Sequence, residues 1–118
     1  MENTLYYYKA HVSQVYDGDT ITVNIDLGLK TFINGEKIRL HRINAPEVRC
    51  AERTEGLKSR DFLREQILGK DIFIETIKDK KGKYGRYLGE IHLPDANGSL
   101  TNINDLLVEK GFAVYHQY

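Results

Sequence analysis

The chain has 118 residues, 41% of them hydrophobic and 29% charged, an ordinary composition for a single globular domain over 1–118. Its 17 basic and 17 acidic residues balance, so any attraction for nucleic acid has to come from a local surface and not from the net charge. The single cysteine excludes an intrachain disulfide, and the lack of a membrane-length apolar run or a leader pattern predicts a cytoplasmic protein with no membrane partner.

The first two strands are predicted on either side of an Asp-Gly break. Residues 5–16 are rich in tyrosine and β-branched side chains, and Asp17-Gly18 interrupts them. Residues 20–27 alternate apolar and polar side chains, which is typical of a strand with one buried face. Because an Asp-Gly step between two strands favours a hairpin, we expect these strands to pair antiparallel.

A third strand is expected to return along the second. Gly28 permits a bend, and Asn34-Gly35 has the composition of a tight hairpin turn with positive φ at both central residues. Residues 37–43 then follow as the returning strand. Pro46, which cannot donate to a strand ladder, marks the end of this segment.

The second half of the chain alternates helices and strands. Apolar residues at helical spacing follow Thr54, which is suited to cap the helix, and Gly69 is suited to end it. Three strands in a meander, a helix and two further strands are the element order of an OB-fold, so we predict a mainly β (α+β) protein with a five-stranded β-barrel and two helices. The later elements are expected over 71–77 (strand), 86–93 (strand) and 103–110 (helix).

Two carboxylates lie at the break between the first two strands. Asp17 and Asp19 flank a single glycine, and a carboxylate beside a glycine turn often only hydrogen-bonds its own backbone. Carboxylate oxygens are also the ligands that Mg²⁺ and Ca²⁺ prefer. The pair is therefore either an ordinary turn or half of a metal site.

Arginines and a glutamate supply the other groups that phosphodiester chemistry needs. Hydrolysis requires a base that activates water and positive charge that meets the charge developing at phosphorus. Arg39 and Arg86 are suited to bind phosphate through their planar guanidinium groups, although an arginine on a strand is often only solvated. Glu47 is suited to be the base, and Lys83 and Tyr84 are suited to bind a neighbouring phosphate or nucleobase.

Taken together and in order, these segments resemble the staphylococcal nuclease (thermonuclease) family over roughly residues 8–115. The resemblance implies an OB-fold and calcium-dependent hydrolysis of the P–O5′ bond of DNA or RNA, leaving 3′-phosphate ends. The motifs that carry it are Asp17-Gly18-Asp19-Thr20, Arg39 with Ala45-Pro46-Glu47, Lys83-Tyr84-Gly85-Arg86, and Asn104 to Val108 followed by Gly111-Phe112-Ala113.

The resemblance assigns each site residue an expected role. Ca²⁺ is the expected cofactor, with another divalent ion as the alternative, because Asn44-Ala45 stands where the family pattern has Asp-Thr and one negative ligand charge is lost. The chain also ends about where the third, C-terminal helix of the family would begin, so we expect that helix to be lacking. The expected assignments are Arg39, Glu47 and Arg86 as catalytic residues; Asp19, Asn44 and the backbone carbonyl of Ala45, supported by Asp17, as metal ligands; and Lys83, Tyr84 and Tyr115 as substrate-binding residues.

Two other functions stay open at this point. A non-catalytic OB-fold module would bind single-stranded nucleic acid or a protein partner through the basic stretch 78–86 and aromatics such as Tyr84 and Tyr115. A purely structural domain with a solvated charged face would have no need of the motif residues. Retention of the whole motif set favours the nuclease, whose expected partner is DNA or RNA. The sequence gives no indication of the oligomeric state.

Overall fold

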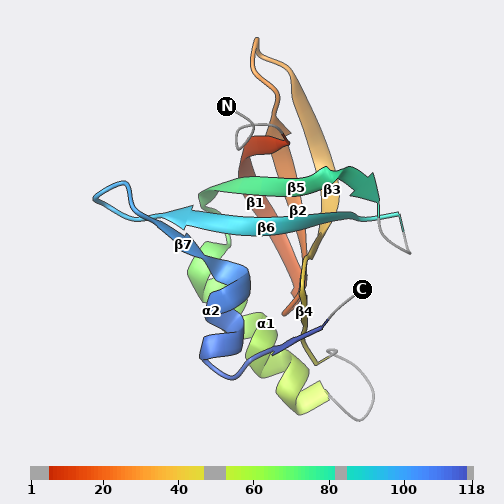
Figure 1. The fold of residues 1–118 in the computed structure, drawn as a ribbon, viewed down its shortest axis with the longest axis vertical. Coiled ribbons are helices and arrows are strands. Elements are labelled where there is room, and N and C mark those ends of the chain that lie inside the picture. The colour runs from red at the N-terminus through yellow and green to blue at the C-terminus, as the bar shows by residue number, and fades with distance from the viewer. Residues whose placement is uncertain (1–5, 47–52, 82–84, 117–118) are drawn as a thin grey trace.

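The computed structural model describes residues 6–46, 53–81 and 85–116, and Figure 1 shows how their strands and helices are arranged. A sheet of long strands forms the body of the molecule, and the helices lie toward one end of it. The elements in chain order are β1 (Tyr7–Asp17), β2 (Thr20–Asp26), β3 (Phe32–Leu40), β4 (Ile43–Asn44), α1 (Arg53–Ile67), β5 (Asp71–Lys81), β6 (Tyr87–Pro94), β7 (Leu100–Asn102), α2 (Ile103–Glu109) and β8 (Val114–Tyr115).

Five strands of the described part close into a barrel, which confirms the predicted OB-type, mainly β fold. The strands follow the order β3-β2-β1-β5-β6, and each neighbouring pair is antiparallel. A parallel pairing of β3 with β6 closes the barrel, with Ile38 opposite Tyr87 and Arg39 opposite Leu88. Gly89 at this seam is tightly packed, since a Cβ atom there would lie 3.0 Å from a side-chain carbon of Ile74.

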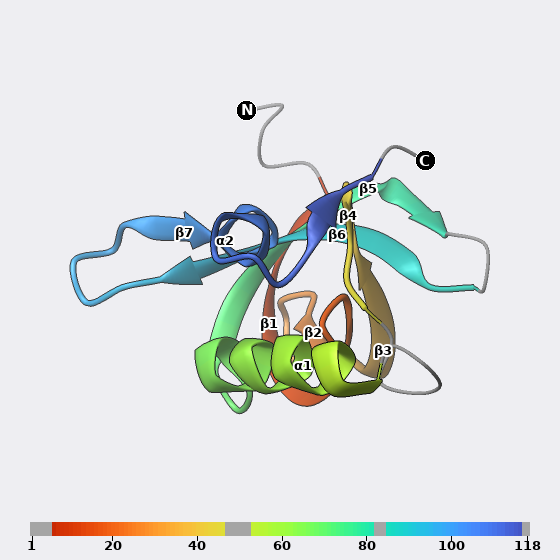
Figure 2. The same cartoon turned by 90° about the horizontal axis from the view of Figure 1, so that it is seen from below.

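Branched aliphatic side chains fill the barrel. The alternation predicted for residues 20–27 is confirmed, because Ile21, Val23 and Ile25 of β2 face the core. α1 lies across the lower end of the barrel (Figure 2) and contributes Leu63 and Ile67, both fully buried. Each buried side chain of this size contributes roughly 1.5–3 kcal/mol, so this core holds in place the strands that carry the motifs.

Two β-bulges bend β1 near its C-terminal end. The pairing of β1 with β2 shifts register twice and leaves Ser13 and Tyr16 each as an extra residue in β1. A bulge bends its strand and redirects the side chain at that position. The bent end of β1 lies against α1, where Arg64 donates from Nε to the carbonyl oxygen of Val15 at 3.3 Å.

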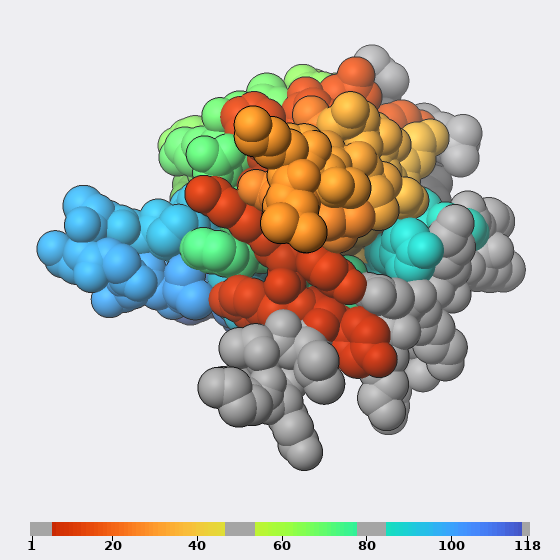
Figure 3. Space-filling view, turned by 90° about the horizontal axis from the view of Figure 1, so that it is seen from above, coloured from red at the N-terminus to blue at the C-terminus, as the bar shows by residue number. Residues whose placement is uncertain are grey.

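The prediction of a hairpin turn at Asn34-Gly35 is wrong. β3 runs through both residues, and the β2–β3 hairpin turns instead at residues 28–31, with Gly28 at a φ of 81°. Gly35 has a φ of 72° and donates its N–H to the side-chain oxygen of Asn24 at 2.9 Å, within a bulge of β3. The positive φ that suits Asn-Gly to a turn also suits it to a bulge. The resulting long hairpin projects at the top of Figure 1 and crosses the face seen in Figure 3.

The helices agree with prediction apart from one cap. α1 begins at Arg53, so Thr54 lies in its first turn and does not cap it, whereas Gly69 follows its end at a φ of 75° as expected. α2 is capped by Asn102, whose side-chain oxygen accepts from the backbone N–H of Asp105 at 3.0 Å. The pairings of β4 with β8 and of β6 with β7 were not predicted. Among the described residues, no helix is long and apolar enough to cross a membrane.

Candidate functional site

The turn between β1 and β2 holds two buried carboxyl groups. Asp17 and Asp19 keep only 7% and 6% of their surface exposed, and the backbone N–H of Asp19 donates to Oδ1 of Asp17 at 3.2 Å. A Cβ atom on Gly18 would lie 2.8 Å from the Cβ atoms of both Ala45 and Ser59. The turn therefore packs against α1 and the residue after β4 only because residue 18 has no side chain.

The carboxyl group of Asp19 opposes the ionisation of Asp17. Burial first, and then the adjacent carboxyl group of Asp19, raise the pKa of Asp17 from its ordinary 3.8 to about 7. Hydrogen bonds from the backbone of Asp19 and the hydroxyl group of Thr20 act in the opposite direction on that pKa. A pair of acids that resists double ionisation binds a proton or a cation favourably.

Arg39 of β3 reaches the same turn. Its Nη2 lies 3.3 Å from Oδ2 of Asp19, and both side chains are largely buried, at 11% and 8% exposed. Its Nη1 donates to the backbone carbonyl oxygens of Leu40 at 2.8 Å and Ile43 at 3.1 Å. Because a planar guanidinium bonded on several sides has little freedom to turn, Arg39 is held in place at the corner between β3 and β4.

Arg86, which directly precedes β6, reaches the turn from another side. Its Nη1 donates to the hydroxyl oxygen of Thr20 at 3.2 Å, and that hydroxyl group donates to Oδ1 of Asp19 at 3.2 Å. The parallel pairing that closes the barrel puts the start of β6 beside Arg39. The β2–β3 pairing, with Thr20 opposite Arg39, places Arg39 at this turn, and barrel closure adds Arg86 from far along the sequence.

Asn44 and Ala45 contribute to the site from β4 and the residue after it. Oδ1 of Asn44 accepts from Nη2 of Arg39 at 3.2 Å, and the backbone N–H of Ala45 donates to Oδ2 of Asp19 at 2.8 Å. Ala45 thus contacts Asp19 through its N–H, and the role expected for its carbonyl oxygen stays a prediction. We call Asp17, Asp19, Arg39, Asn44 and Arg86 the Asp–Arg cluster.

The donor atoms of this cluster suit a hard divalent cation. Carboxyl oxygens of Asp17 and Asp19 and the amide oxygen of Asn44 are the ligand types that such ions select, and a cation relieves the repulsion between the two acids. No group of three or more acidic, histidine or cysteine side chains suited to a metal is found within residues 6–46, 53–81 and 85–116. The described residues therefore offer an ion two carboxylates, with neutral oxygens to complete its shell.

Of the four other residues expected in the site, Tyr115 alone lies within the described part of the chain. Glu47, Lys83 and Tyr84 lie outside the residues that the structure describes. Tyr115 belongs to β8, opposite Ile43, with 58% of its surface exposed. Its hydroxyl group donates to Oδ1 of Asp105 at 2.9 Å, so its contacts tie it to a second polar cluster, and its expected role in substrate binding stays a prediction.

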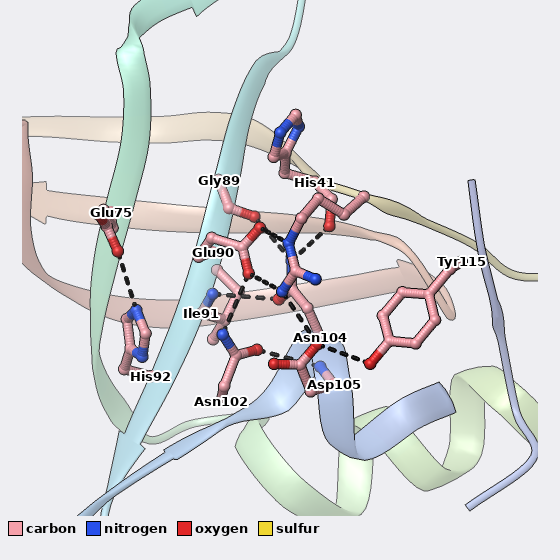
Figure 4. Close-up of polar contacts among 11 residues, drawn as sticks. His41, Glu75, Gly89, Glu90, Ile91, His92, Asn102, Asn104, Asp105 and Tyr115 are labelled. Atoms are coloured by element: carbon pink, nitrogen blue, oxygen red, sulfur yellow. Dashed lines mark hydrogen bonds and ion pairs between the residues drawn. The ribbon is translucent and has the colours of Figure 1, made fainter. Parts of the chain in front are cut away.

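This second cluster was missed in the sequence, and its polar contacts are drawn in Figure 4. Arg42 donates from Nε and Nη2 to the two carboxylate oxygens of Glu90, both at 2.8 Å, and from Nη2 to Asp105 at 2.9 Å. Its guanidinium lies 5.7 Å from the ring centroid of Tyr115. Hydrogen bonding to Glu90 holds the pKa of Arg42 above its ordinary value. We call these four residues the Arg42 clamp.

The clamp maintains a strained backbone beside the Asp–Arg cluster. Arg42 has a φ of 70°, a left-handed conformation that costs a non-glycine residue of order 1–3 kcal/mol. Such a conformation persists only where surrounding contacts over-determine it, and the bonds to Glu90 and Asp105 do so. Arg42 directly precedes Ile43 and Asn44, so the clamp positions the corner that Arg39 also holds.

Asn104 fastens α2 to the barrel. It is fully buried, its Nδ2 donates to the carbonyl oxygens of His41 at 2.9 Å and Gly89 at 3.0 Å, and its Oδ1 accepts from the N–H of Ile91 at 3.1 Å. Every one of these bonds is to backbone, which fixes the helix against the seam of the barrel. The signal available in the sequence was an asparagine beside Ile103, on the apolar face of a short helix.

Comparison with known proteins agrees with the motifs. An "Uncharacterized endonuclease" of Escherichia coli O157:H7 is 33% identical over 108 residues, which cover 91% of this chain and 61% of that protein. "Micrococcal nuclease" of Shigella flexneri is 28% identical over 115 residues, with 94% and 60% covered. An uncharacterized protein of Methanocaldococcus jannaschii is 29% identical over 130 residues, with 91% and 58% covered. The chain spans about three fifths of the length of these curated relatives.

A family model described as "Staphylococcal nuclease homologue" matches residues 37–118. The matched region contains both arginines of the Asp–Arg cluster, the seam between β3 and β6, and α2. It includes the motif segments that carried the resemblance, apart from the β1–β2 turn. The chain therefore belongs to the family of staphylococcal nuclease homologues.

Proposed function

We propose that this chain is a nuclease domain that uses a divalent metal ion to hydrolyse phosphodiester bonds of DNA or RNA. The observation that carries the proposal is the convergence of Arg39 and Arg86 on Asp19, directly at 3.3 Å for Arg39 and through Thr20 for Arg86. Two guanidinium groups beside a buried pair of acids would supply the positive charge and the metal ligands that phosphodiester hydrolysis uses. Membership of the family and the nuclease names of two relatives support the same activity.

The metal would be held by Asp17, Asp19 and Asn44, and Ca²⁺ is the ion that the family resemblance implies. A bound divalent ion polarises a phosphate oxygen and offsets negative charge in the transition state. Because Asn44 is neutral, this chain presents fewer charged ligands than the family pattern, and affinity for the ion depends on that charge. Mg²⁺ or Mn²⁺ in place of Ca²⁺ is therefore the alternative that experiments should include.

The arginines would bind the phosphate and stabilise the charge that develops on it. A guanidinium stays protonated and donates parallel N–H bonds to phosphate oxygens. Without substrate, Nη2 of Arg39 is shared between Asp19 and Asn44, so an incoming phosphate would replace these partners. Such preorganised donors typically contribute about 100- to 1000-fold to the rate.

The reaction adds the oxygen of water to phosphorus as the P–O5′ bond breaks. A base takes the proton from the attacking water, the departing O5′ takes up a proton, and the product end carries a 3′-phosphate. This direction of cleavage is the one that the family resemblance implies. Glu47, which lies outside the described residues, is the base that the motif implies.

A non-catalytic module for single-stranded nucleic acid is the second candidate. The observation that favours it is the exposure of Tyr115, which keeps 58% of its surface accessible and so offers an aromatic ring for stacking. In a binding module, affinity would come from cationic and aromatic side chains and would not require a metal.

Cleavage of an end-labelled single-stranded DNA with Ca²⁺, Mg²⁺, Mn²⁺ or EDTA tests the two candidates. The nuclease predicts cleavage with at least one ion, none in EDTA, and losses of about 100-fold or more in the Arg39→Ala, Arg86→Ala and Glu47→Gln variants. Lys110→Ala, at an exposed position after α2, is the control that should keep full activity. DNA left intact with every ion, together with salt-sensitive binding in EDTA, would establish the module and refute the enzyme.

A further inference from the structure

The bent end of β1 and one side of α1 enclose a groove beside the carboxylate turn. Its volume is about 400 Å³, which lies within the usual range of ligand sites. Ser13 and Tyr16, the extra residues of the two bulges, both line it, so the irregular path of β1 shapes this space. The residues that line what we call the β1–α1 groove include Ser13, Gln14, Tyr16, Arg60, Arg64 and Leu68.

Tyr16 presents an aromatic ring to this groove. The residue is 56% exposed, whereas its neighbours Val15 and Asp17 are buried, so the bulge turns the ring outward from a fixed backbone. Leu68, which is 42% exposed, adds apolar surface. A tyrosine ring in such a place offers a face on which a nucleobase stacks, and only two side-chain torsions need to be ordered.

Two arginines make the groove basic. Arg64 donates from Nε and Nη2 to the carbonyl oxygen of Val15 at 3.3 and 3.2 Å, which orients the guanidinium and uses two of its five N–H donors. Within the described part of the chain Arg64 forms no ion pair with a carboxylate, and its contacts are to the neutral Val15 carbonyl.

Arg60 is paired, but weakly. It donates to Asp61 of the same helix at 3.1 and 3.2 Å, and the side chain of Asp61 is 63% exposed. The Arg60 side chain is 24% exposed, so the pair is open to solvent on its Asp61 side. Surface pairs contribute about 0–1 kcal/mol, so a phosphate can replace the exposed Asp61 at little cost. None of the described residues that line the groove is acidic. The groove therefore combines a stacking surface with cationic groups, which is the chemistry of single-strand binding sites.

We propose that the β1–α1 groove is a subsite for single-stranded nucleic acid, in which Tyr16 stacks on a base and Arg60 and Arg64 contact adjoining phosphates. The inference rests on the proposed function and extends it to a substrate class. Tyr16 precedes Asp19 by three residues, so their Cα atoms are at most about 11 Å apart, a distance that a strand of a few nucleotides spans. A duplex is a poor ligand here because its bases are already stacked and paired.

Binding to a fluorescent oligothymidylate and to a duplex of equal length, measured by anisotropy in EDTA, tests the subsite. We expect tighter binding of the single strand, a Kd about tenfold higher for Tyr16→Ala, and near wild-type binding for Tyr16→Phe, which retains the ring. The double variant Arg60→Gln, Arg64→Gln should reduce the slope of log K against log salt by about 1.4, since each phosphate contact to a single strand contributes about 0.7. Lys110→Ala is the charge-removing control, and thermal melts verify that every variant is folded.

Three results would overturn the subsite: no measurable binding of the single strand, equal affinity for the duplex, or unchanged binding by folded Tyr16→Ala. Cleavage assays on the same proteins separate this inference from the nuclease proposal. Binding that depends on Tyr16 without cleavage in any ion would refute the nuclease and retain the groove. Cleavage that depends on Arg39 but is unaffected in KM by Tyr16→Ala would retain the nuclease and refute the groove.

Discussion

Replacing Asp17 with asparagine should stabilise the metal-free protein at neutral and alkaline pH. Burial and the neighbouring Asp19 raise the folded-state pKa of Asp17 from 3.8 to about 7. Between these values the folded state binds a proton that the unfolded state has released. Stability is therefore greatest below the unfolded pKa, falls as the pH rises through this window, and levels off above the folded pKa.

The size of the effect follows from the same shift. A pKa that rises from 3.8 to about 7 corresponds to about 4 kcal/mol once both states are ionised. Solvent screening at a carboxyl group that is not fully enclosed reduces this value, and we expect about 2 kcal/mol. Asparagine keeps the shape and hydrogen-bonding capacity of the side chain without the charge. Asp17→Asn should thus exceed wild type by about 2 kcal/mol near pH 8 and match it near pH 4.

Urea unfolding followed by circular dichroism, in EDTA and across this pH range, measures the difference. Asp61→Asn, which removes an exposed carboxylate from α1, is the matched control and should reproduce the wild-type pH profile. A wild-type stability that is flat from about pH 5 to 8, with Asp17→Asn no more stable at the upper end, would refute the reasoning.

Three further predictions concern the metal, the packing of the turn and the clamp. Ca²⁺ at 100 times its Kd should stabilise the protein by about 2.7 kcal/mol, measured in a thermal melt. The same stabilisation by Ca²⁺ in the Asp19→Asn variant would contradict the metal site. Gly18→Ala should lower the free energy of unfolding in urea by about 2–3 kcal/mol, because the added Cβ would lie 2.8 Å from two neighbouring carbons. The control Gly98→Ala, at an open position with positive φ, should lose about 1 kcal/mol, and equal losses would contradict the packing argument. Arg42→Gln leaves the largely buried Glu90 without its charge partner and should cost about 2–3 kcal/mol, so a loss under about 0.5 kcal/mol would show that the clamp is not needed.

The barrel was predictable because alternation along a strand decides which side chains are buried. The strands over residues 20–27 and 71–77 needed no more than this local pattern. The turn predicted at Asn34-Gly35 was wrong because a glycine with positive φ fits a turn or a bulge equally well. Which of the two forms depends on the bond to Asn24 in the neighbouring strand. The pairing of Ile43 with Tyr115 also depends on residues far apart in sequence, which no local pattern encodes.

The residues of the Asp–Arg cluster could be predicted from the sequence, but the hydrogen bonds that link them could not. The motifs named Asp19, Arg39 and Arg86, and the closed barrel brings them together. Thr20 was quoted only as part of a motif, yet its hydroxyl group links Arg86 to Asp19. Arg42 gave no signal because its left-handed backbone is determined by tertiary contacts with other elements.

The position of a bound phosphate tests the central claim most directly. The measurement is a crystal structure of the protein soaked with Ca²⁺ and a nucleoside 3′,5′-bisphosphate. We predict a phosphate whose oxygens accept hydrogen bonds from the guanidinium groups of both Arg39 and Arg86, with the ion bound at Asp19. A phosphate bound only elsewhere, with Arg39 still on Asp19 and Arg86 still on Thr20 at saturating ligand, would contradict the account.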